Sequence, residues 1–207
     1  MVGRTKYMSM EEIVQLREKT QLWALRDAKR GKRRGVTAWA LVDLALSTGL
    51  RVSELAAIKA EDFDYDRGFV FVTRAKKRQA KKDKKKDSKP TEREPLAIDR
   101  AVLAHIKDCL GGRAEGPLFI GSRGPLTAQG LQRLWLSAID RAKLPHYSIH
   151  AARHSIAMQL LENTNNLRLV QKQLGHLSPI TTANLYVDIR FEKMQQAVSD
   201  LYERKKI

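Results

Sequence analysis

Cysteine and long apolar runs are scarce in this 207-residue sequence, and acidic residues are far fewer than basic ones. Its single cysteine, Cys109, cannot form an internal disulfide, which favours a reducing compartment. The most apolar run, Trp39 to Leu46, is interrupted by Asp43 and is far shorter than the roughly 20 residues that a membrane span needs. The first six residues lack the apolar stretch of a signal peptide. We therefore expect a soluble, cytoplasmic protein with no membrane partner.

Several motifs that mark other classes of protein are also missing. The sequence has no internal repeat and no Gly/Ser-rich linker, so we expect residues 1–207 to form a single domain. It has no glycine loop of the kind that cradles nucleotide phosphates, and no set of carboxylates at metal-binding spacing. The sequence therefore gives no sign of a metal ion or another cofactor, and we expect none.

Basic residues, by contrast, are abundant. There are 39 Lys and Arg against 23 Asp and Glu, which gives a net charge of +16. A highly solvated surface or an anionic membrane would also accommodate such a charge. An excess this large is nevertheless typical of proteins that bind the phosphate backbone of nucleic acid. We therefore expect double-stranded DNA as a partner, and association with the nucleoid if the source is prokaryotic.

Hydrophobic periodicity predicts a mainly α-helical protein with a small antiparallel β-sheet. Aromatic and β-branched residues indicate a strand at 69–73, and a second strand at about 93–98 would pair with it. The apolar residues of 36–48 surround the whole helix, which should therefore be central to the core. Helices are predicted, as one or two segments at the first range, at 9–30, 36–48, 51–58, 99–110, 127–144, 148–163, 167–174 and from 178 past 186.

The segment between the two predicted strands, residues 74–93, holds eleven Lys and Arg. It cannot pack into a core, and is either a disordered solubilising loop or a basic arm that orders on DNA. We favour the arm, whose DNA-binding residues would be Arg74, Lys77, Arg78, Lys81, Lys82, Lys84, Lys85 and Lys86. The cluster at 29–34 has the same two interpretations, a solvated loop or a backbone contact made by Arg33 and Arg34.

Four side chains that are costly to bury stand at the ends of predicted helices. Arg51 lies at the turn between two apolar helices, where packing on both sides would hold it. His150 and Arg153 are three residues apart and share a helix face, as a surface ion pair would also require. His176 follows the helix that Gly175 ends, a position that a helix cap can equally occupy. His150, Arg153 and His176, with Tyr186 downstream, together indicate a phosphate-handling site.

The motifs around these residues resemble those of the tyrosine recombinases, also called phage-type integrases, in the subgroup of the bacterial Xer recombinases. Thr48-Gly-Leu-Arg51-Val-Ser-Glu54 is similar to the family's first arginine motif with its supporting acid. His150-Ala-Ala-Arg153-His-Ser resembles the histidine and second arginine motif, and Leu174-Gly-His176 resembles the later histidine. Tyr186 matches the nucleophile. The resemblance implies the catalytic domain fold of that family and runs from about residue 9 to about residue 205.

The resemblance also implies a role for each residue. Arg51, Arg153 and His176 would stabilise the charge on a phosphodiester that Tyr186 attacks, and His150 would position the phosphate or accept the tyrosine proton. The catalytic lysine would be Lys76, although Lys77 is adjacent. Nine residues separate His176 from Tyr186 where the family pattern has eight. One extra residue turns a helical side chain by about 100°, so the approach of the tyrosine could differ.

The activity implied is site-specific cleavage and rejoining of DNA through a 3′-phosphotyrosine intermediate. There are two alternatives to recombination. One is a type IB topoisomerase, which uses the same tyrosine cleavage, and the other is a regulator that has the same fold and binds DNA without cutting it. We expect residues 1–207 to correspond to the family's catalytic domain without its N-terminal core-binding domain, either as a natural single-domain protein or as a fragment of a longer one. A helix is expected at about 190–204, with an apolar stripe at Phe191, Met194, Val198 and Leu201 that would pack either on its own domain or, as the resemblance implies, on a neighbouring protomer. We expect a tetramer on DNA and a monomer or weak dimer without it.

Overall fold

The computed structural model describes residues 7–73 and 93–175. The chain divides into two compact units, one ending at Ser155 and the other beginning at Ile156. Helices predominate and are accompanied by a small antiparallel sheet, which confirms the predicted fold class. None of the helices described is long and apolar enough to cross a membrane.

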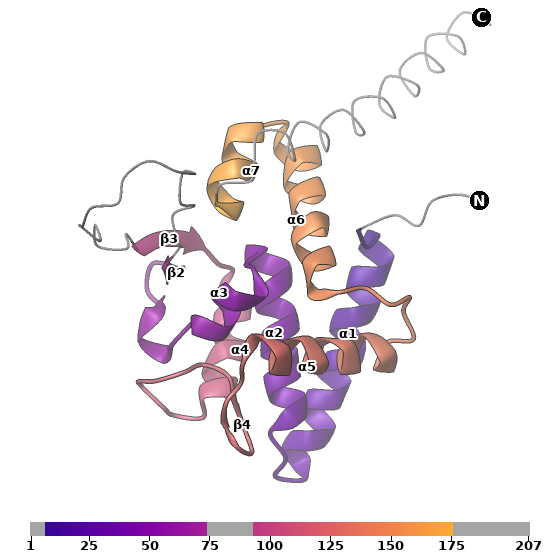
Figure 1. The fold of residues 1–207 in the computed structure, drawn as a ribbon, viewed down its shortest axis with the longest axis vertical. Helices are drawn as coiled ribbons and strands as arrows, with labels where there is room; N and C mark the ends of the chain where they lie inside the picture. Colours follow the sequence, from indigo (N-terminus) through magenta and orange to yellow (C-terminus); the bar gives the residue numbers. More distant parts are fainter. Residues whose placement is uncertain (1–6, 74–92, 176–207) are drawn as a thin grey trace, which may run out of the picture. The chain divides into compact units, whose positions relative to one another are not determined.

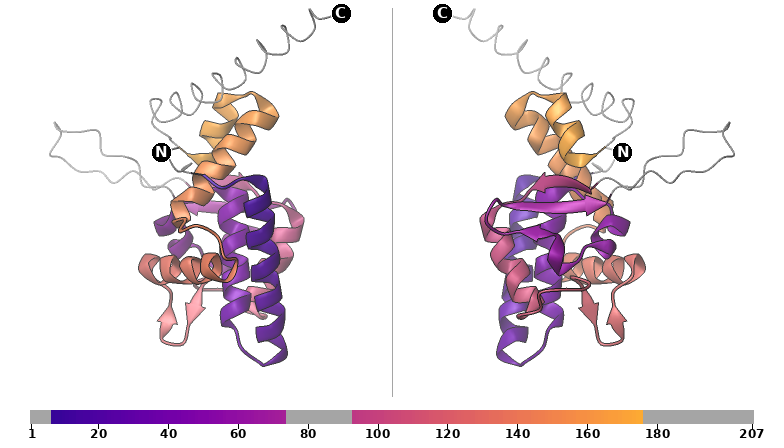
Figure 2. Two further views of the ribbon diagram at one scale, coloured as in Figure 1. Left: turned by 90° about the vertical axis from the view of Figure 1, so that its right-hand side faces the viewer. Right: turned by 90° about the vertical axis from the view of Figure 1, so that its left-hand side faces the viewer.

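The first unit is built on a pair of long helices, α1 (Met10–Lys29) and α2 (Arg34–Thr48), which run side by side (Figures 1 and 2). The predicted helix at 9–30 is a single element. It begins with a capping box, in which the Ser9 hydroxyl accepts from the Glu12 amide and the Glu12 carboxylate accepts from the Ser9 amide. Gly35 allows the two helices to approach closely, because a Cβ there would lie 2.7 Å from the Trp23 carbonyl oxygen.

Helix α2 is the centre of the core, as its sequence predicts. All but four of its residues are buried, and α4 (Arg100–Leu110) and α5 (Ala128–Arg141) pack against it. Its only buried charge is Asp43, whose carboxylate accepts from Arg17 Nε of α1 at 2.8 Å and is hydrogen-bonded to His105 Nδ1 of α4. The Asp43 carboxylate therefore ties both neighbouring helices to α2, and its buried charge is compensated.

A three-stranded antiparallel sheet, ordered β1-β2-β3, follows the short helix α3 (Val52–Ala57) and a 3₁₀ turn, η1 (Ala60–Asp62). The two predicted strands are confirmed as β2 (Phe69–Thr73) and β3 (Arg93–Ala97), with Thr73 opposite Arg93. The sequence between them therefore connects the paired ends of a hairpin. Strand β1 (Phe63–Asp64) lies in a segment for which no strand was predicted. Only two residues of that segment pair with β2.

The second half of the first unit contains a small hairpin, helix α5 and the start of helix α6. Strands β4 (Ile120–Gly121) and β5 (Gly124–Pro125) form the hairpin before α5. Helix α5 ends three residues before the predicted position, because Lys143 adopts a left-handed conformation, with φ of 54°, and the Leu144 amide donates back to the Ile139 carbonyl. Helix α6 (Ile149–Thr164) begins at the residue after Ser148, as predicted.

The second unit begins within α6 and continues into α7 (Leu167–Leu174). Asn166 caps α7, since its side-chain oxygen accepts from the Leu169 amide at 3.1 Å. Gly175 follows the last helical residue with a positive φ of 61°. Both bounds match the prediction for 167–174.

Candidate active site

The candidate site is built on the turn between α2 and α3. Gly49 ends α2 in the left-handed conformation, with φ of 63°, and its amide donates to the Ala45 carbonyl at 3.0 Å. Glycine adopts this conformation without the steric cost that a Cβ brings. The chain then becomes extended at Arg51, which caps α3 with φ of −69° and ψ of 152°. The sharp turn places Arg51 directly after the most deeply buried helix of the unit.

Glu54 fixes both the backbone and the side chain of Arg51. One carboxylate oxygen accepts from the Arg51 amide at 2.7 Å, and the other accepts from Arg51 Nη1 at 2.8 Å. The Glu54 side chain is only 9 % exposed, whereas that of Arg51 is 37 % exposed. Neither Nε nor Nη2 of Arg51 donates to a described residue. Part of the guanidinium therefore faces solvent in a fixed orientation, with donors available to an anion.

Helix α6 brings the second arginine to the same turn. Arg153 is 7 % exposed, and its Nη1 donates to the Gly49 carbonyl oxygen at 2.7 Å. Gly49 and Arg51 are two residues apart, so their Cα atoms are separated by at most about 7 Å. The contact with Gly49 therefore brings the guanidinium of Arg153 to the turn that carries Arg51.

The first turn of α1 and the residues just before it anchor the start of α6. The buried Ser155 hydroxyl accepts from the Met8 amide at 2.9 Å and donates to the Ala151 carbonyl at 2.8 Å. One turn before α6, the Tyr147 hydroxyl donates to the carboxylate of Glu12, the residue that also caps α1. These contacts hold the helical turn that carries Arg153 from the side of α1.

The Tyr147 segment is also held from α5 and from further along α1. The indole Nε1 of Trp135 donates to the Tyr147 carbonyl at 2.9 Å, and Gln15 Nε2 donates to the Ala142 carbonyl at 2.8 Å. The connection from α5 to α6 is therefore fixed at both of its ends. A helix held this way places its side chains reproducibly, as a preorganised site requires.

Two guanidiniums carried to one turn have the chemistry to bind an oxyanion. Arginine remains protonated in proteins, and the Gly49 carbonyl orients Arg153 without neutralising it. Forked N–H donors match the geometry of phosphate and carboxylate oxygens. A site with one buried and one half-buried guanidinium would stabilise negative charge more strongly than exposed arginines would. Water screens the attraction between a guanidinium and an anion less when the guanidinium is buried.

His150 has different surroundings from Arg153, and the remaining predicted catalytic residues lie outside the described part of the chain. His150 is at the start of α6 but is exposed, whereas Arg153 on the same helix is buried, so the two side chains have different surroundings. Lys76, His176 and Tyr186 lie outside the described residues, and so do the DNA-binding residues predicted in the arm at 74–93, which are Arg74, Lys77, Arg78, Lys81, Lys82, Lys84, Lys85 and Lys86.

Arg33 and Arg34, the other residues predicted to contact DNA, lie at the opposite end of α2 from Gly49. Helix α2 has 15 residues, so the two ends are about 22 Å apart. Arg33 Nη2 donates to the carbonyls of Asp108 and Cys109 at the end of α4, and Arg34 Nη2 donates to Ser137 Oγ at 3.2 Å. Both side chains therefore hold neighbouring helices, which the basic sequence cluster did not reveal.

Sequence comparisons show the kinds of protein that this chain is similar to. The model of the phage integrase family matches residues 10–193. Tyrosine recombinase XerC of Xylella fastidiosa (strain M23) is 32% identical over 175 residues, which cover 82% of this chain and 54% of that protein. The chain thus spans about half the length of the curated relatives it matches.

Solved structures agree at the level of the fold. XerA recombinase has a TM-score of 0.66 at 19% identity, with 97% of this chain and 65% of that chain covered. XerH site-specific recombinase, in a post-cleavage complex with palindromic difH substrate, has a TM-score of 0.70 at 20% identity, covering 93% of this chain and 52% of that one. At these identities the likeness establishes the fold.

Proposed function

The chain belongs to the phage integrase family, and from this membership we propose that it is a tyrosine recombinase that breaks and rejoins DNA at specific sites. The observation that carries the proposal is the contact between Arg153 Nη1 and the carbonyl of Gly49, two residues before Arg51. It supports a pair of guanidiniums acting on one phosphodiester, which is the charge arrangement that this reaction needs.

Each arginine has a distinct part in the proposed reaction. Arg51, held by Glu54, donates to one nonbridging oxygen of the scissile phosphate, and Arg153 donates to the other. A pentavalent phosphorus carries more charge on these oxygens than the starting diester does. Donors that are already oriented therefore stabilise the transition state more than the bound substrate. His176 is proposed to add a third hydrogen bond to the same oxygens.

Tyr186 is the proposed nucleophile. Its hydroxyl oxygen forms a bond to phosphorus as the bond from phosphorus to the 5′ oxygen breaks. The phenol proton passes to His150, and Lys76 gives a proton to the departing 5′ oxygen, with Lys77 as the other candidate. The products are a 3′-phosphotyrosine bond and a free 5′ hydroxyl. Attack of a 5′ hydroxyl on the phosphotyrosine then rejoins the strand and releases the tyrosine.

This sequence of steps requires neither a metal ion nor ATP. One phosphoester is exchanged for another at each step, so the energy of the broken bond is retained for rejoining. The arginines supply the positive charge that a divalent cation supplies in other phosphoryl transfers. Chelators and the omission of nucleotide should therefore leave cleavage unchanged.

The partners follow from the same reaction. Exchange between two duplexes needs four cleaved strands, so we propose a tetramer on DNA that is a monomer or weak dimer when free. The arm at 74–93 and its lysines are proposed to neutralise backbone phosphates, which makes affinity fall steeply with salt. We propose that residues 1–207 act as one catalytic domain, with a C-terminal helix at about 190–204, in the cytoplasm.

A nicked suicide substrate tests the proposed reaction. The duplex should be built from inverted repeats in the DNA that flanks the gene, and the nick should let the short 5′ fragment diffuse away so that cleavage cannot reverse. We expect a covalent complex on a denaturing gel with the wild-type chain and none with Tyr186→Phe. Binding without any complex would indicate a regulator instead of an enzyme. Relaxation of a supercoiled plasmid that lacks the repeats would indicate a topoisomerase.

A further inference from the structure

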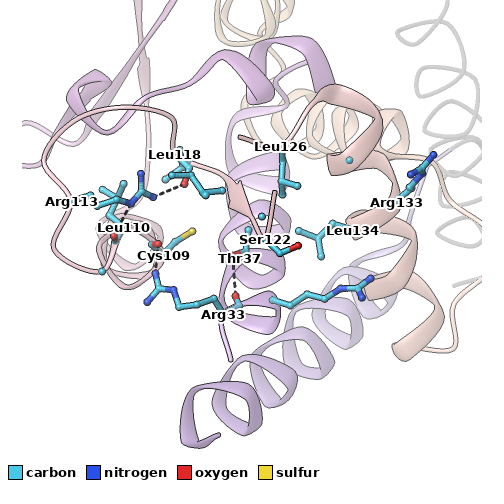
Figure 3. Close-up of a pocket in the computed structure, with 15 residues that line it drawn as sticks. Arg33, Thr37, Cys109, Leu110, Arg113, Leu118, Ser122, Leu126, Arg133 and Leu134 are labelled. Atoms are coloured by element: carbon cyan, nitrogen blue, oxygen red, sulfur yellow. Dashed lines mark hydrogen bonds between the residues drawn. The ribbon is translucent and has the colours of Figure 1, made fainter. Parts of the chain in front are cut away.

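A pocket lies at the N-terminal end of α2, about one helix length from the Gly49 turn. Its volume is about 810 Å³, and its walls come from α2, the end of α4, the β4–β5 hairpin and α5 (Figure 3). The proposed recombination reaction makes no use of it. It falls in the size range of sites that hold small ligands or peptide side chains, which is roughly 300–1,000 Å³.

All the charged residues that line the pocket are cationic. Four arginines line it, and no aspartate or glutamate does: Arg33, Arg34, Arg113 and Arg133. Among the described residues, no carboxylate lies within ion-pair distance of any of these guanidiniums. An excess of four positive charges around one concavity produces a strong positive potential, since low-dielectric walls focus the field.

Neutral acceptors hold three of the four arginines in place. Arg113 donates to the carbonyls of Leu110, Pro117 and Leu118, the last two at 2.7 and 3.0 Å. Arg33 donates to carbonyls at the end of α4, and Arg34 donates to Ser137 Oγ. These contacts fix the positions of the charges without cancelling them. Arg133 is exposed, donates to none of the described residues, and lies at the rim on α5 (Figure 3).

The floor of the pocket is apolar. Leucine side chains from α4, from the two flanks of the β4–β5 hairpin and from α5 line it, and Cys109 lies among them: Leu110, Leu118, Leu126 and Leu134. Ile120 at the hairpin adds an exposed apolar side chain, 39 % accessible, at the mouth. Burial raises the pKa of the Cys109 thiol to about 11, even though Arg33 and Arg113 lower it, which is consistent with a dry floor beneath the charged rim.

The arginines around the pocket and its apolar floor together indicate which kind of ligand would fit. A DNA backbone brings phosphates but no apolar group to fill a pocket floored by leucines. A peptide segment brings both when a large apolar side chain stands beside aspartates or glutamates. We propose that this pocket docks an acidic segment of a partner protein, with one apolar side chain inserted between α4, α5 and the β4–β5 hairpin.

The position of the pocket adds a functional consequence. The two ends of α2 are about 22 Å apart, so a segment seated here would not cover the Arg51 turn. A partner could therefore stay attached while the arginine pair holds a phosphate. The pocket is accordingly a place for a protein that recruits or regulates the chain.

NMR titration of the ¹⁵N-labelled chain tests the proposal. The probe is an acetylated, amidated hexapeptide of four aspartates and two leucines, and the reporters are the amides of Gly121 and Gly130 in the pocket wall. We expect both amides to shift with this peptide and to shift far less with the same peptide carrying serines in place of the leucines. Equal shifts with the serine peptide, or none with either, would overturn the proposal.

Two variants and a matched control locate the binding. Arg133→Glu reverses a rim charge without removing a hydrogen bond, and Ser122→Trp places a bulky side chain at the mouth, so both should weaken peptide binding severalfold or more. Arg100→Glu changes net charge equally at an exposed residue outside the pocket and should leave binding unchanged. Thermal melting checks that each variant is folded. An equal loss in Arg100→Glu, or a short duplex DNA that displaces the peptide from both glycines, would refute a peptide site.

Discussion

The two ends of α2 carry arginines in opposite settings. At the C-terminal end, Arg153 is buried and Arg51 is paired with a buried carboxylate, so each guanidinium has one fixed orientation. At the N-terminal end, Arg33 and Arg34 are exposed and surround an apolar pocket together with other arginines. Residue type alone does not separate the two groups. Burial separates Arg153 from Arg33 and Arg34, and a carboxylate acceptor separates Arg51 from them. These differences make the first group suited to catalysis and the second to docking.

The largest difference between the two ends should appear on removal of one arginine from each. Arg153→Ala takes away a buried, oriented donor, so we expect the rate of covalent complex formation on the suicide substrate to fall by about 10²–10³-fold. Arg133→Ala removes an exposed guanidinium that has no described partner and should leave that rate unchanged. Comparable losses of cleavage rate in the two variants would show that the two ends of α2 do not differ in catalytic importance. Arg153→Lys keeps the charge without the fork, and full activity of a folded Arg153→Lys variant would also contradict it.

A smaller effect should follow from loosening Arg51 while keeping it. Glu54→Gln retains the shape of the acid but loses its charge, so Arg51 becomes less well oriented. Cleavage should slow by roughly 10- to 100-fold, the equivalent of one charge-assisted hydrogen bond of about 1.5–3 kcal/mol. Glu61→Gln is the matched control. Like Glu54, Glu61 pairs with a basic side chain, that of Lys59, and accepts from a backbone amide, that of Gly116. If both variants slow cleavage alike, Glu54 has no special relation to Arg51.

The anchor between α1 and α6 should matter less than either arginine contact. Ser155→Ala leaves the buried Met8 amide without its acceptor and should lower the free energy of unfolding by about 1–3 kcal/mol. We also expect a severalfold lower cleavage rate at saturating DNA with unchanged affinity, because Arg153 lies two residues away. Ser155→Thr keeps the hydroxyl and should restore the rate. A variant that loses stability but cleaves at the normal rate would show that the anchor is purely structural.

The smallest effect concerns the pocket end, where Cys109 reports on the dryness of the floor. Its pKa is raised from 9.0 to about 11, so only about one thiol in a thousand is ionised at pH 8. Alkylation by iodoacetamide should be far slower in the folded chain than in urea. Because the folded-state pKa is the higher one, this burial contributes stability below about pH 9 that is lost as the pH rises toward 11. Equally fast alkylation in both states would place water in the floor.

Local signals predicted the helices and most of the sheet. The Ser9 cap, the apolar circumference of α2 and the glycines at 49 and 175 each act within a few residues, so the element ends could be located from the pattern. Strand β1 was missed because two residues are too few to show an alternation. The early end of α5 depends on a left-handed lysine, Lys143, a conformation that its residue type does not favour.

Long-range contacts could not be predicted from the pattern. Asp43 interrupts an apolar run, but its partners Arg17 and His105 are 26 and 62 residues away. The contact between Arg153 and Gly49 joins residues 104 apart, and only the family resemblance brought the two arginines together beforehand. The pocket is assembled from four separate segments, and the basic cluster at 29–34 gave no sign that its arginines would stand beside leucines from three of them.

The most direct test of the account is to locate the tyrosine that becomes joined to DNA. Trypsin separates the two candidates, because Tyr186 lies in the peptide 173–190 and Tyr202 lies in the peptide 194–204. The covalent complex from the suicide substrate would be digested with nuclease and trypsin and analysed by mass spectrometry. We predict a 3′-phosphonucleotide on the peptide that contains Tyr186. Its presence on the peptide that contains Tyr202, or a chain that binds the substrate and never forms the complex, would contradict the proposed mechanism.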